Sequence, residues 1–330
     1  VLVTGSEGFL GSHLTEKLID LNYEVTAIIQ YNSYNDYGWL SSLVKKNSKK
    51  LKVFFGDVRD ESFLDNHFKD VKIVYHLAAL ISIPHSYNSY SSYVDTNIVG
   101  TKNVLTLSKK YKLKKIFITS TSEVYGTAKK TPIDEDHVIN PQSPYAATKS
   151  AADYLALSFF KTFNLPVTII RPFNAFGPRQ SARAIIPNIM CQLVNRVKKI
   201  NIGNLDSKRD FTFVADTVDA FIKATKTKKN IKGQVINISS NFEISIKKLV
   251  ELIFIATKMK AKLKIEKKRL RPKKSEVNRL LGSNIKARNL LNWQSSIKTE
   301  KDFIKYLKIT FDWLKKKENL TKYDYKRYNF

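Results

Sequence analysis

The sequence predicts an α/β protein: a Rossmann-type doubly wound parallel sheet with a smaller C-terminal substrate-binding α/β domain. Three observations support this fold class. Short, nearly all-apolar runs alternate with longer amphipathic stretches through the first half, which is typical of a parallel sheet covered on both faces. A glycine-rich turn joins the first apolar run to the first amphipathic stretch. After Pro172 the alternation becomes less regular, which indicates a second unit.

Each apolar run is expected to be a strand, and each amphipathic stretch a helix that crosses over to the next parallel strand. The expected strands of the first half are Val1–Thr4, Glu24–Ile29, Leu51–Phe55, Ile73–His76, Lys115–Thr119 and Val167–Arg171. The helices between them are Phe9–Leu21, Glu61–Lys69, Val94–Lys110 and Tyr145–Thr162. Beyond Pro172 we expect helices near Ala184–Val197, Val214–Lys226, Ile246–Lys258 and Lys301–Lys317, with a strand at Val235–Ile238.

Composition excludes several classes of protein. Hydrophobic residues make up 43% of the 330 residues and aromatic residues 12%, too many for an intrinsically disordered chain. No uninterrupted apolar run approaches the roughly 18–20 residues of a membrane span. The single Cys191 excludes an internal disulfide framework and points to a reducing compartment. We therefore expect a cytoplasmic protein with no membrane partner.

The chain is strongly basic, with 57 Lys and Arg residues against 29 Asp and Glu residues, a formal charge of +28. The excess is mostly lysine and is concentrated after Ala256. A solvated lysine-rich face is the favoured explanation, ahead of attraction to a polyanionic ligand such as a diphosphate, and ahead of nucleic-acid binding. No known nucleic-acid-binding pattern accompanies the charge, so no nucleic-acid partner is expected.

The first strand runs directly into G-x-x-G-x-x-G at Gly5, Gly8 and Gly11, and Phe9 and Leu10 open the following helix. Glycine is needed there for a tight turn, for close approach to a pyrophosphate and for packing of helix on strand. The helix N-terminus then presents free N–H groups to the phosphates. The motif predicts a dinucleotide cofactor rather than an ordinary strand-to-helix turn.

The end of the second strand bears on which dinucleotide is bound. NAD enzymes usually have an acidic residue there, which holds the adenosine ribose 2′-hydroxyl. This chain has Gln30 and Asn32 instead, which can hydrogen-bond a hydroxyl but neither repel nor neutralise a 2′-phosphate. The pattern favours NAD and leaves NADP open. Asp57, after the third strand, is a candidate partner of the adenine amino group, with a turn or helix-capping role as the alternative.

Tyr145 and Lys149 form Y-x-x-x-K, which places both on one face of a helix. A neighbouring ammonium is expected to lower the pKa of a phenol from its usual ~10. Tyr145 could then remove a hydroxyl proton while a hydride leaves the same carbon. The pattern is common by chance, but with the glycine-rich turn and a strand ending at Ser120 and Thr121 it predicts an oxidoreductase site.

The chain resembles the extended short-chain dehydrogenase/reductase family, in its NAD-dependent nucleotide-sugar epimerase and dehydratase branch. The resemblance implies a tightly bound NAD. Within the branch, the run QYNSYNDYGWL (30–40) is most similar to 4,6-dehydratases of legionaminic-acid pathways, which act on nucleotide-activated N-acetylglucosamine. The matching segments are GSEGFLG (5–11), GDVRD (56–60), HLAAL (76–80), DTNIVGT (95–101), TSTSEVYG (119–126), SPYAATK (143–149), RPFNAFGPR (171–179) and RDFTFVAD (209–216).

The residues after the fifth strand bear on the type of reaction. Removing water across C5 and C6 of a hexose needs a keto group at C4, a base for the C5 proton and an acid for the C6 hydroxyl. Glu123 lies two residues after Thr121, so both would face one side of an extended segment. The resemblance assigns the C5 proton to Glu123 and a hydrogen bond to the C4 oxygen to Thr121. Many dehydratases have an acidic proton donor at the position of Ser122, so here either Glu123 delivers that proton or Ser122 relays it through water.

Three alternatives stay open. Thr-Ser-Glu also occurs in UDP-glucuronate decarboxylases, although their basic residue before the active-site tyrosine is replaced here by the run Gln142-Ser143-Pro144. A nucleotide-sugar 4-epimerase usually lacks a carboxylate at Glu123, because no C5 proton moves. A catalytically silent nucleotide-binding regulator would lose the catalytic residues, which are all present. The sequence favours a 4,6-dehydratase of UDP- or GDP-N-acetylglucosamine.

The resemblance assigns the remaining site residues. Asn97 would order Lys149 through water, and three arginines would meet the nucleotide phosphates and ribose. No metal is expected. The predicted cofactor contacts are Gly5, Gly8, Phe9, Leu10, Gly11, Gln30, Asn32, Asp57, Val58, Leu77, Ala78, Ala79, Asn97, Tyr145, Lys149 and Pro172. The predicted substrate contacts are Ser82, His85, Thr121, Asn174, Arg179, Arg209 and Arg271.

Domain and subunit organisation follow. Residues 1–172 with about 211–240 are expected to form the NAD-binding Rossmann domain, and 173–210 with 241–330 the nucleotide-sugar-binding domain. By resemblance, the helices Val94–Lys110 and Tyr145–Thr162 pair across a two-fold axis as a four-helix bundle. Leu155, Phe159 and Phe163 give the second helix additional apolar surface. A homodimer is expected, and a tetramer is left open.

Overall fold

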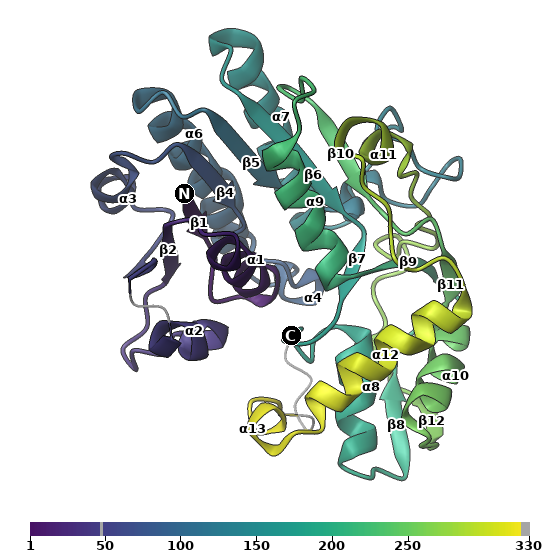
Figure 1. The fold of residues 1–330 in the computed structure, drawn as a ribbon. Helices are drawn as coiled ribbons and strands as arrows, with labels where there is room; N and C mark the ends of the chain where they lie inside the picture. Colours follow the sequence, from purple (N-terminus) through teal and green to yellow (C-terminus); the bar gives the residue numbers. More distant parts are fainter. Residues whose placement is uncertain (47–48, 325–330) are drawn as a thin grey trace.

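A seven-stranded parallel sheet forms the centre of the molecule (Figure 1). The structure is a computed structural model that describes residues 1–46 and 49–324. The strand order β3-β2-β1-β4-β5-β6-β10, with parallel pairing throughout, is that of a Rossmann fold, and it confirms the predicted fold class. The strands are β1 (Leu2–Thr4), β2 (Val25–Gln30), β3 (Leu51–Gly56), β4 (Ile73–His76), β5 (Lys115–Thr119), β6 (Val167–Pro172) and β10 (Val235–Ile238).

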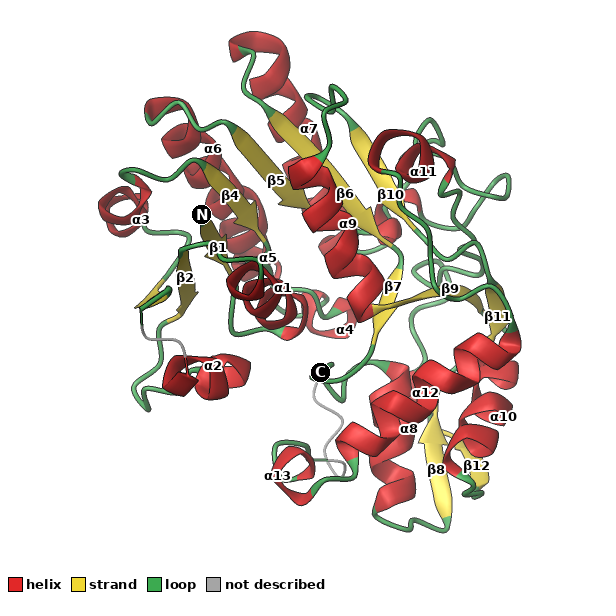
Figure 2. Ribbon diagram, in the orientation of Figure 1, coloured by secondary structure: helices red, strands yellow, loops and turns green. Residues whose placement is uncertain are grey.

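Helices cover both faces of this sheet (Figure 2). Val3 and Tyr75 belong to the apolar core under α1, α9 and α11, whereas Leu2 and Val74 point the other way, into the core under α3, α6 and α7. Because helices exclude water from both faces of the sheet, the strands are apolar throughout, and apolar residues do not alternate with polar ones. The elements are α1 (Phe9–Asp20), η1 (Gly38–Leu40), α2 (Ser41–Lys46), α3 (Glu61–Phe68), α6 (Gly100–Lys110), α7 (Pro144–Phe163), α9 (Val214–Lys226) and α11 (Ile285–Leu291).

The helix expected at Val94–Lys110 begins earlier and is not uniform. After α4 (Ile83–Ser86), α5 (Tyr90–Val94) continues into a π-helical turn, η2 (Asp95–Val99), and only then into α6. A π turn is wider than an α turn and is often found at functional sites. This one carries Asn97 and places its side chain beside α7.

The remaining elements surround a second apolar core (Figure 1). The Phe176 ring at its centre lies 5.1–6.3 Å from the rings of Phe211, Phe213 and Phe303. The helices expected here are present, whereas most of the short strands were not predicted. The elements are β7 (Asn174–Phe176), α8 (Ile185–Val194), β8 (Lys199–Ile202), β9 (Lys208–Phe213), β11 (Glu243–Ser245), α10 (Ile246–Thr257), β12 (Lys262–Ile265), η4 (Lys267–Arg269), α12 (Glu300–Leu314) and α13 (Lys317–Leu320).

The second core lies against the cofactor end of the sheet. Phe9 and Leu10, at the start of α1, pack partly buried against it. The exact domain boundaries stay a prediction, and residues 325–330 of the expected second domain lie outside the described residues. Within the part of the chain that the structure describes, no helix combines the length and apolarity needed to cross a bilayer.

Candidate active site

The glycine-rich turn between β1 and α1 closes tightly on the loop after β4. Gly5 has a φ of +67°, and a Cβ atom there would lie 2.8 Å from the Ala78 backbone. A Cβ atom on Gly11 would collide with the Gly5 carbonyl oxygen. No side chain caps the start of α1 at Gly8, so its first amide groups are available to a pyrophosphate. The residues present therefore fit a bound dinucleotide.

Other predicted cofactor contacts surround this turn. The amides of Leu77 and Ala78 donate to Thr4 and attach the loop 77–79 to the end of β1. The Val58 side chain packs closely against Gly100, at the start of α6, where a Cβ atom would lie 2.7 Å from Val58 Cγ2. Pro172 ends β6 beside β10. The fold thus gathers these residues near the carboxyl ends of the strands, while their contact with a cofactor stays a prediction.

Two predicted adenosine contacts have partners within the protein. Asp57 receives hydrogen bonds from Arg59 Nε and Nη2 at 2.5–2.9 Å, and these hold the pKa of its carboxyl below the usual value. The Asn32 side-chain carboxamide donates to the carbonyl oxygens of Gln30 and Asp36 and accepts from the Asp36 backbone amide, all within its own loop. Asp57 also accepts a hydrogen bond from the Arg59 backbone amide at 2.9 Å, so it closes the turn after β3, as Asn32 closes its own loop. Their contact with adenosine stays a prediction.

Tyr145 and Lys149 lie one turn apart in α7, which begins where Ser143 accepts a hydrogen bond from the Ala146 amide at 3.1 Å. The two side chains are 7% and 3% exposed. Burial raises the pKa of Tyr145, a hydrogen bond with Thr121 lowers it, and the charge of Glu123 raises it further. The expected lowering by Lys149 is therefore wrong for this structure: burial dominates, and Thr121 is the group that favours the phenolate.

Asp153 continues the row of Tyr145 and Lys149 at the next turn of α7, and it was not predicted. Burial lowers the pKa of Lys149 to about 8, and the charge of Asp153 opposes this. Asp153 is itself held by Arg171 Nη2 at 2.9 Å and by the Ser120 hydroxyl at 2.6 Å. The spacing of four residues was the available signal. A buried carboxylate thus favours the ammonium form of Lys149.

Glu123 lies in a 3-10 turn, η3 (Ser122–Tyr125), and not in the extended segment that was expected. Thr121 caps this turn, because its hydroxyl accepts a hydrogen bond from the Glu123 amide at 3.2 Å. Although the stated reason was wrong, Thr121 and Glu123 do converge on Tyr145, since both change its pKa. Ser122 is buried in the same turn.

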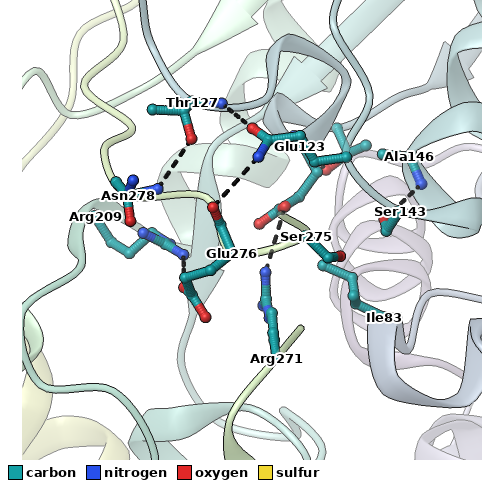
Figure 3. A network of polar contacts seen from close by, with 12 residues as sticks. Ile83, Glu123, Thr127, Ser143, Ala146, Arg209, Arg271, Ser275, Glu276 and Asn278 are labelled. Atoms are coloured by element: carbon teal, nitrogen blue, oxygen red, sulfur yellow. Dashed lines mark hydrogen bonds and ion pairs between the residues drawn. The ribbon is translucent and has the colours of Figure 1, made fainter. Parts of the chain in front are cut away.

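Two arginines from the C-terminal half reach this turn. Figure 3 shows Arg271 pointing to Glu123, with Nη1 3.6 Å from Oε2. Arg209 lies nearby and pairs with Glu276 at 3.3 Å. Burial lowers the pKa of Arg209, opposed by the charge of Glu123. These two predicted phosphate-binding arginines are therefore close to the proposed base.

Gln142, two residues before α7, connects the same regions. Its Nε2 donates to the carbonyl oxygens of Lys274 and Glu276 at 2.9 and 3.3 Å, and its Oε1 accepts from the Thr127 amide. Both N–H groups and the oxygen of the Gln142 carboxamide therefore form hydrogen bonds with backbone groups. Gln142 attaches the segment that carries Arg271 to the loop after η3.

Ser82 and His85 lie on the loop and short helix near Tyr145. The Tyr93 hydroxyl donates to the Ser82 carbonyl at 2.5 Å, and the Tyr93 ring meets Tyr145 edge-on at 6.3 Å. The His85 ring lies 5.8 Å from the Tyr93 ring. Both predicted sugar contacts are thus placed near Tyr145 through Tyr93, which was not predicted.

The other predicted contacts are more dispersed. The Asn97 side-chain carboxamide accepts a hydrogen bond from the Leu80 backbone amide and donates one to the Leu80 carbonyl. It also donates to the hydroxyl of Thr148, the neighbour of Lys149, at 3.0 Å. Asn174 donates to the Asp210 carbonyl at 3.1 Å. Arg179 pairs with Glu16 on α1 at 2.7 Å, so the structure places it beside α1 and not with Arg209 and Arg271.

The structure combines a Rossmann sheet whose first strand ends in a glycine-rich turn with Tyr145 and Lys149 on one helix and Thr121 just after β5, which is the arrangement expected of an extended short-chain dehydrogenase/reductase. Residues 2–304 match the family model described as GDP-mannose 4,6 dehydratase, and the chain belongs to this family of nucleotide-sugar dehydratases and epimerases.

Relatives with two different activities are similar to this chain. The UDP-glucuronate 4-epimerase of Thermodesulfobacterium geofontis is 31% identical over 330 residues, 97% of this chain and 98% of that protein. The human dTDP-D-glucose 4,6-dehydratase is 32% identical over 260 residues, 77% and 73% of the two chains. The crystal structure of UDP-glucuronic acid 4-epimerase from Bacillus cereus, in complex with UDP-glucuronic acid and NAD, has a TM-score of 0.86 at 30% identity and covers 95% of this chain and 98% of that one. The predicted cofactor is thus present in a solved relative.

Proposed function

We propose that the protein is a nucleotide-sugar 4,6-dehydratase that acts on UDP- or GDP-N-acetylglucosamine. The observation that carries this proposal is the position of Glu123, a carboxylate only 9% exposed whose charge acts on Tyr145. A 4-epimerase moves no C5 proton and needs no carboxylate there. The similarity of residues 30–40 to legionaminic-acid-pathway dehydratases supports the amino sugar as substrate.

The chain's own groups divide the chemistry between them. The turn 5–11 would hold NAD, which would supply the acceptor for the C4 hydride and the donor of that hydride to C6. Tyr145 removes the proton of the C4 hydroxyl, and the Thr121 hydroxyl stabilises the phenolate. The Lys149 ammonium, favoured by Asp153, lies one turn of α7 from Tyr145 and adds a positive charge to the site. Once C4 is a ketone, the C5 hydrogen is acidic and Glu123 removes it.

The departing C6 hydroxyl also needs a proton. A serine hydroxyl such as that of Ser122 is too weak an acid to supply it unaided. Glu123 becomes a carboxylic acid when it accepts the C5 proton, and a carboxylic acid is far stronger, with an ordinary pKa of ~4.3. We infer that Glu123 delivers the same proton to the C6 hydroxyl, with Ser122 and a water as the alternative relay.

A nucleotide-sugar 4-epimerase is the second candidate, because two of the relatives described above are 4-epimerases and match this chain over nearly their whole length. A UDP-glucuronate decarboxylase is less favoured, since Gln142 uses its carboxamide to hold backbone instead of presenting a cation to a sugar carboxylate. A silent regulator would have no use for four catalytic side chains assembled at one site.

Incubation of purified protein with UDP- and GDP-N-acetylglucosamine, each separately, tests the proposal. We expect NMR to show a 4-keto-6-deoxy sugar from one of them, without net reduction of nicotinamide by absorbance. The Tyr145→Phe variant should form no product. UDP-glucuronate is tested in a third incubation. A 4-epimer of any of the three substrates would establish the epimerase, release of CO₂ from UDP-glucuronate would establish the decarboxylase, and inertness on all three would favour the regulator.

We further propose that the protein is a cytoplasmic homodimer, formed through α5–α6 and α7. Exposed apolar side chains on these helices, among them Val99 and Tyr154, support the dimer. The free, buried thiol of Cys191 is compatible with a reducing compartment.

A further inference from the structure

Glu7 lies inside the glycine-rich turn, between Gly5 and Gly8, and its carboxylate faces the end of β2. Oε1 accepts a hydrogen bond from the Gln30 amide at 3.0 Å. Oε2 is buried and has no hydrogen-bond partner among the described residues. Leaving a buried acceptor unpaired is unfavourable, so such an atom indicates that a donor comes from elsewhere.

The position of Glu7 is defined by the turn that follows β2. The Trp39 amide donates to the Glu7 carbonyl oxygen at 3.2 Å. Gly38, with a φ of +57°, approaches so closely that a Cβ atom there would lie 3.0 Å from Glu7 Cβ. Asp36 in turn accepts a hydrogen bond from the Gly38 amide at 2.8 Å. The carboxylate is therefore held in place without any ligand.

The end of β2 is where a Rossmann fold binds the adenosine ribose, usually through an acidic residue on β2 itself. This chain has no acid there: Gln30 is exposed, and the Asn32 amide closes its own loop. Glu7 brings a carboxylate to the same strand end from the neighbouring turn.

We propose that Glu7 supplies this missing carboxylate, accepting a hydrogen bond at Oε2 from an adenosine ribose hydroxyl and excluding the 2′-phosphate of NADP. The inference rests on the dinucleotide binding proposed above and names the residue that selects NAD. A carboxylate accepts strong hydrogen bonds from hydroxyls. It repels a phosphate at close range, most strongly where water is partly excluded. Burial raises the pKa of Glu7, opposed by the Gln30 amide, and a second donor would favour the charged form further.

A competition experiment on the full-length protein tests this selectivity. The protein is incubated with equal excesses of NAD⁺ and NADP⁺, freed of unbound dinucleotide and denatured, and the released dinucleotides are quantified by chromatography. The wild type should release almost only NAD⁺. Glu7→Gln keeps an acceptor for the Gln30 amide but has no charge, so we expect the ratio of NAD⁺ to NADP⁺ to fall about 10- to 100-fold, the factor for one hydrogen bond to a charged group.

Two further variants separate charge at this site from charge in general. Glu24→Gln removes one negative charge beside the opposite end of β2 and should leave the ratio unchanged. Glu7→Asp retains the charge and should still exclude NADP⁺. An unchanged ratio in Glu7→Gln, or a wild type that takes up both dinucleotides equally, overturns the role of Glu7. A wild type that takes up neither overturns the proposed cofactor, and with it the proposed function.

Discussion

Glu123 influences both halves of the proposed reaction. As a base it would remove the C5 proton, and as a charge it raises the pKa of Tyr145. Arg271 Nη1 lies 3.6 Å from the Glu123 carboxylate. Neutralising Glu123 should therefore have opposite effects on the two steps: it abolishes the base for C5 and makes Tyr145 easier to ionise.

For Glu123→Gln we expect elimination to slow by about 10²- to 10⁴-fold, the usual contribution of a general acid or base. Exchange of the C5 proton with deuterated water, followed by NMR, should be lost to the same extent. Oxidation at C4 should persist and extend to lower pH, because a negative neighbour of Tyr145 has been removed. Tyr145→Phe should instead abolish C4 oxidation. Normal C5 exchange in Glu123→Gln would show that another group is the base.

At the scale of elements, α7 organises the site by presenting Tyr145, Lys149 and Asp153 at successive turns. Asp153 also connects α7 to β6 through Arg171, both side chains being almost fully buried. A buried pair of this kind contributes little net stability but is costly to break from one side, by about 3–5 kcal/mol. Its electrostatic effect on Lys149 is the clearer benefit.

The pH profile should report this effect. Lys149 has a pKa of about 8, so a rate that needs its ammonium should decline above that pH. Asp153 raises this pKa, so Asp153→Asn should move the alkaline limb of kcat to lower pH. The position of the limb does not depend on how much protein is folded, and urea unfolding measures the expected loss of stability separately. Asp65→Asn, at an ion pair with Lys110 on the outer surface of α3, is the control. A limb that stays in place or moves to higher pH would contradict the role of Asp153.

Elements with a strong sequence pattern could be predicted, because buried parallel strands and amphipathic helices leave that pattern in the chain itself. The irregular turns could not. In the π turn Asp95–Val99, the Asn97 side chain donates hydrogen bonds to the Leu80 carbonyl and to the Thr148 hydroxyl, both distant in sequence. The strands after Pro172 could not be predicted either, because they are too short to show a periodic pattern of apolar residues.

The candidate site divides in the same way. Thr121, Tyr145 and Lys149 could be located because motifs mark them. The roles of Glu7, Gln142 and Asp153 depend on partners that only the fold brings near: the Gln30 amide, the backbone at residues 274–276, and Arg171. A sequence contains these residues without indicating which contacts they make.

At the scale of the whole molecule, the helices α5 and α6 pack with η2 beside α7 on one side of the sheet (Figure 2). These helices leave apolar side chains exposed. Of the residues expected to form a subunit interface, Leu155 and Phe159 pack partly buried against the core of the same chain. The third expected residue, Phe163, is exposed, and so are four residues that were not predicted; the five are between 37% and 61% accessible: Tyr90, Val94, Val99, Tyr154 and Phe163. Exposed apolar side chains on neighbouring helices are typical of a surface that a second copy covers.

Substituting Tyr154 tests whether these helices form the dimer. Across a two-fold axis one substitution enters the interface twice, so Tyr154→Asp places two charges in an apolar contact. We expect sedimentation velocity to show twice the 37.9 kDa chain mass for the wild type and a single chain for this variant. Its melting temperature at high dilution should be little changed, because Tyr154 is 59% exposed in the single chain. Ile255→Asp is the matched control: Ile255 is also 59% exposed but lies on α10 in the second unit, so this variant should remain dimeric. A monomeric wild type, or a Tyr154→Asp variant that stays dimeric, would exclude α7 from the subunit interface.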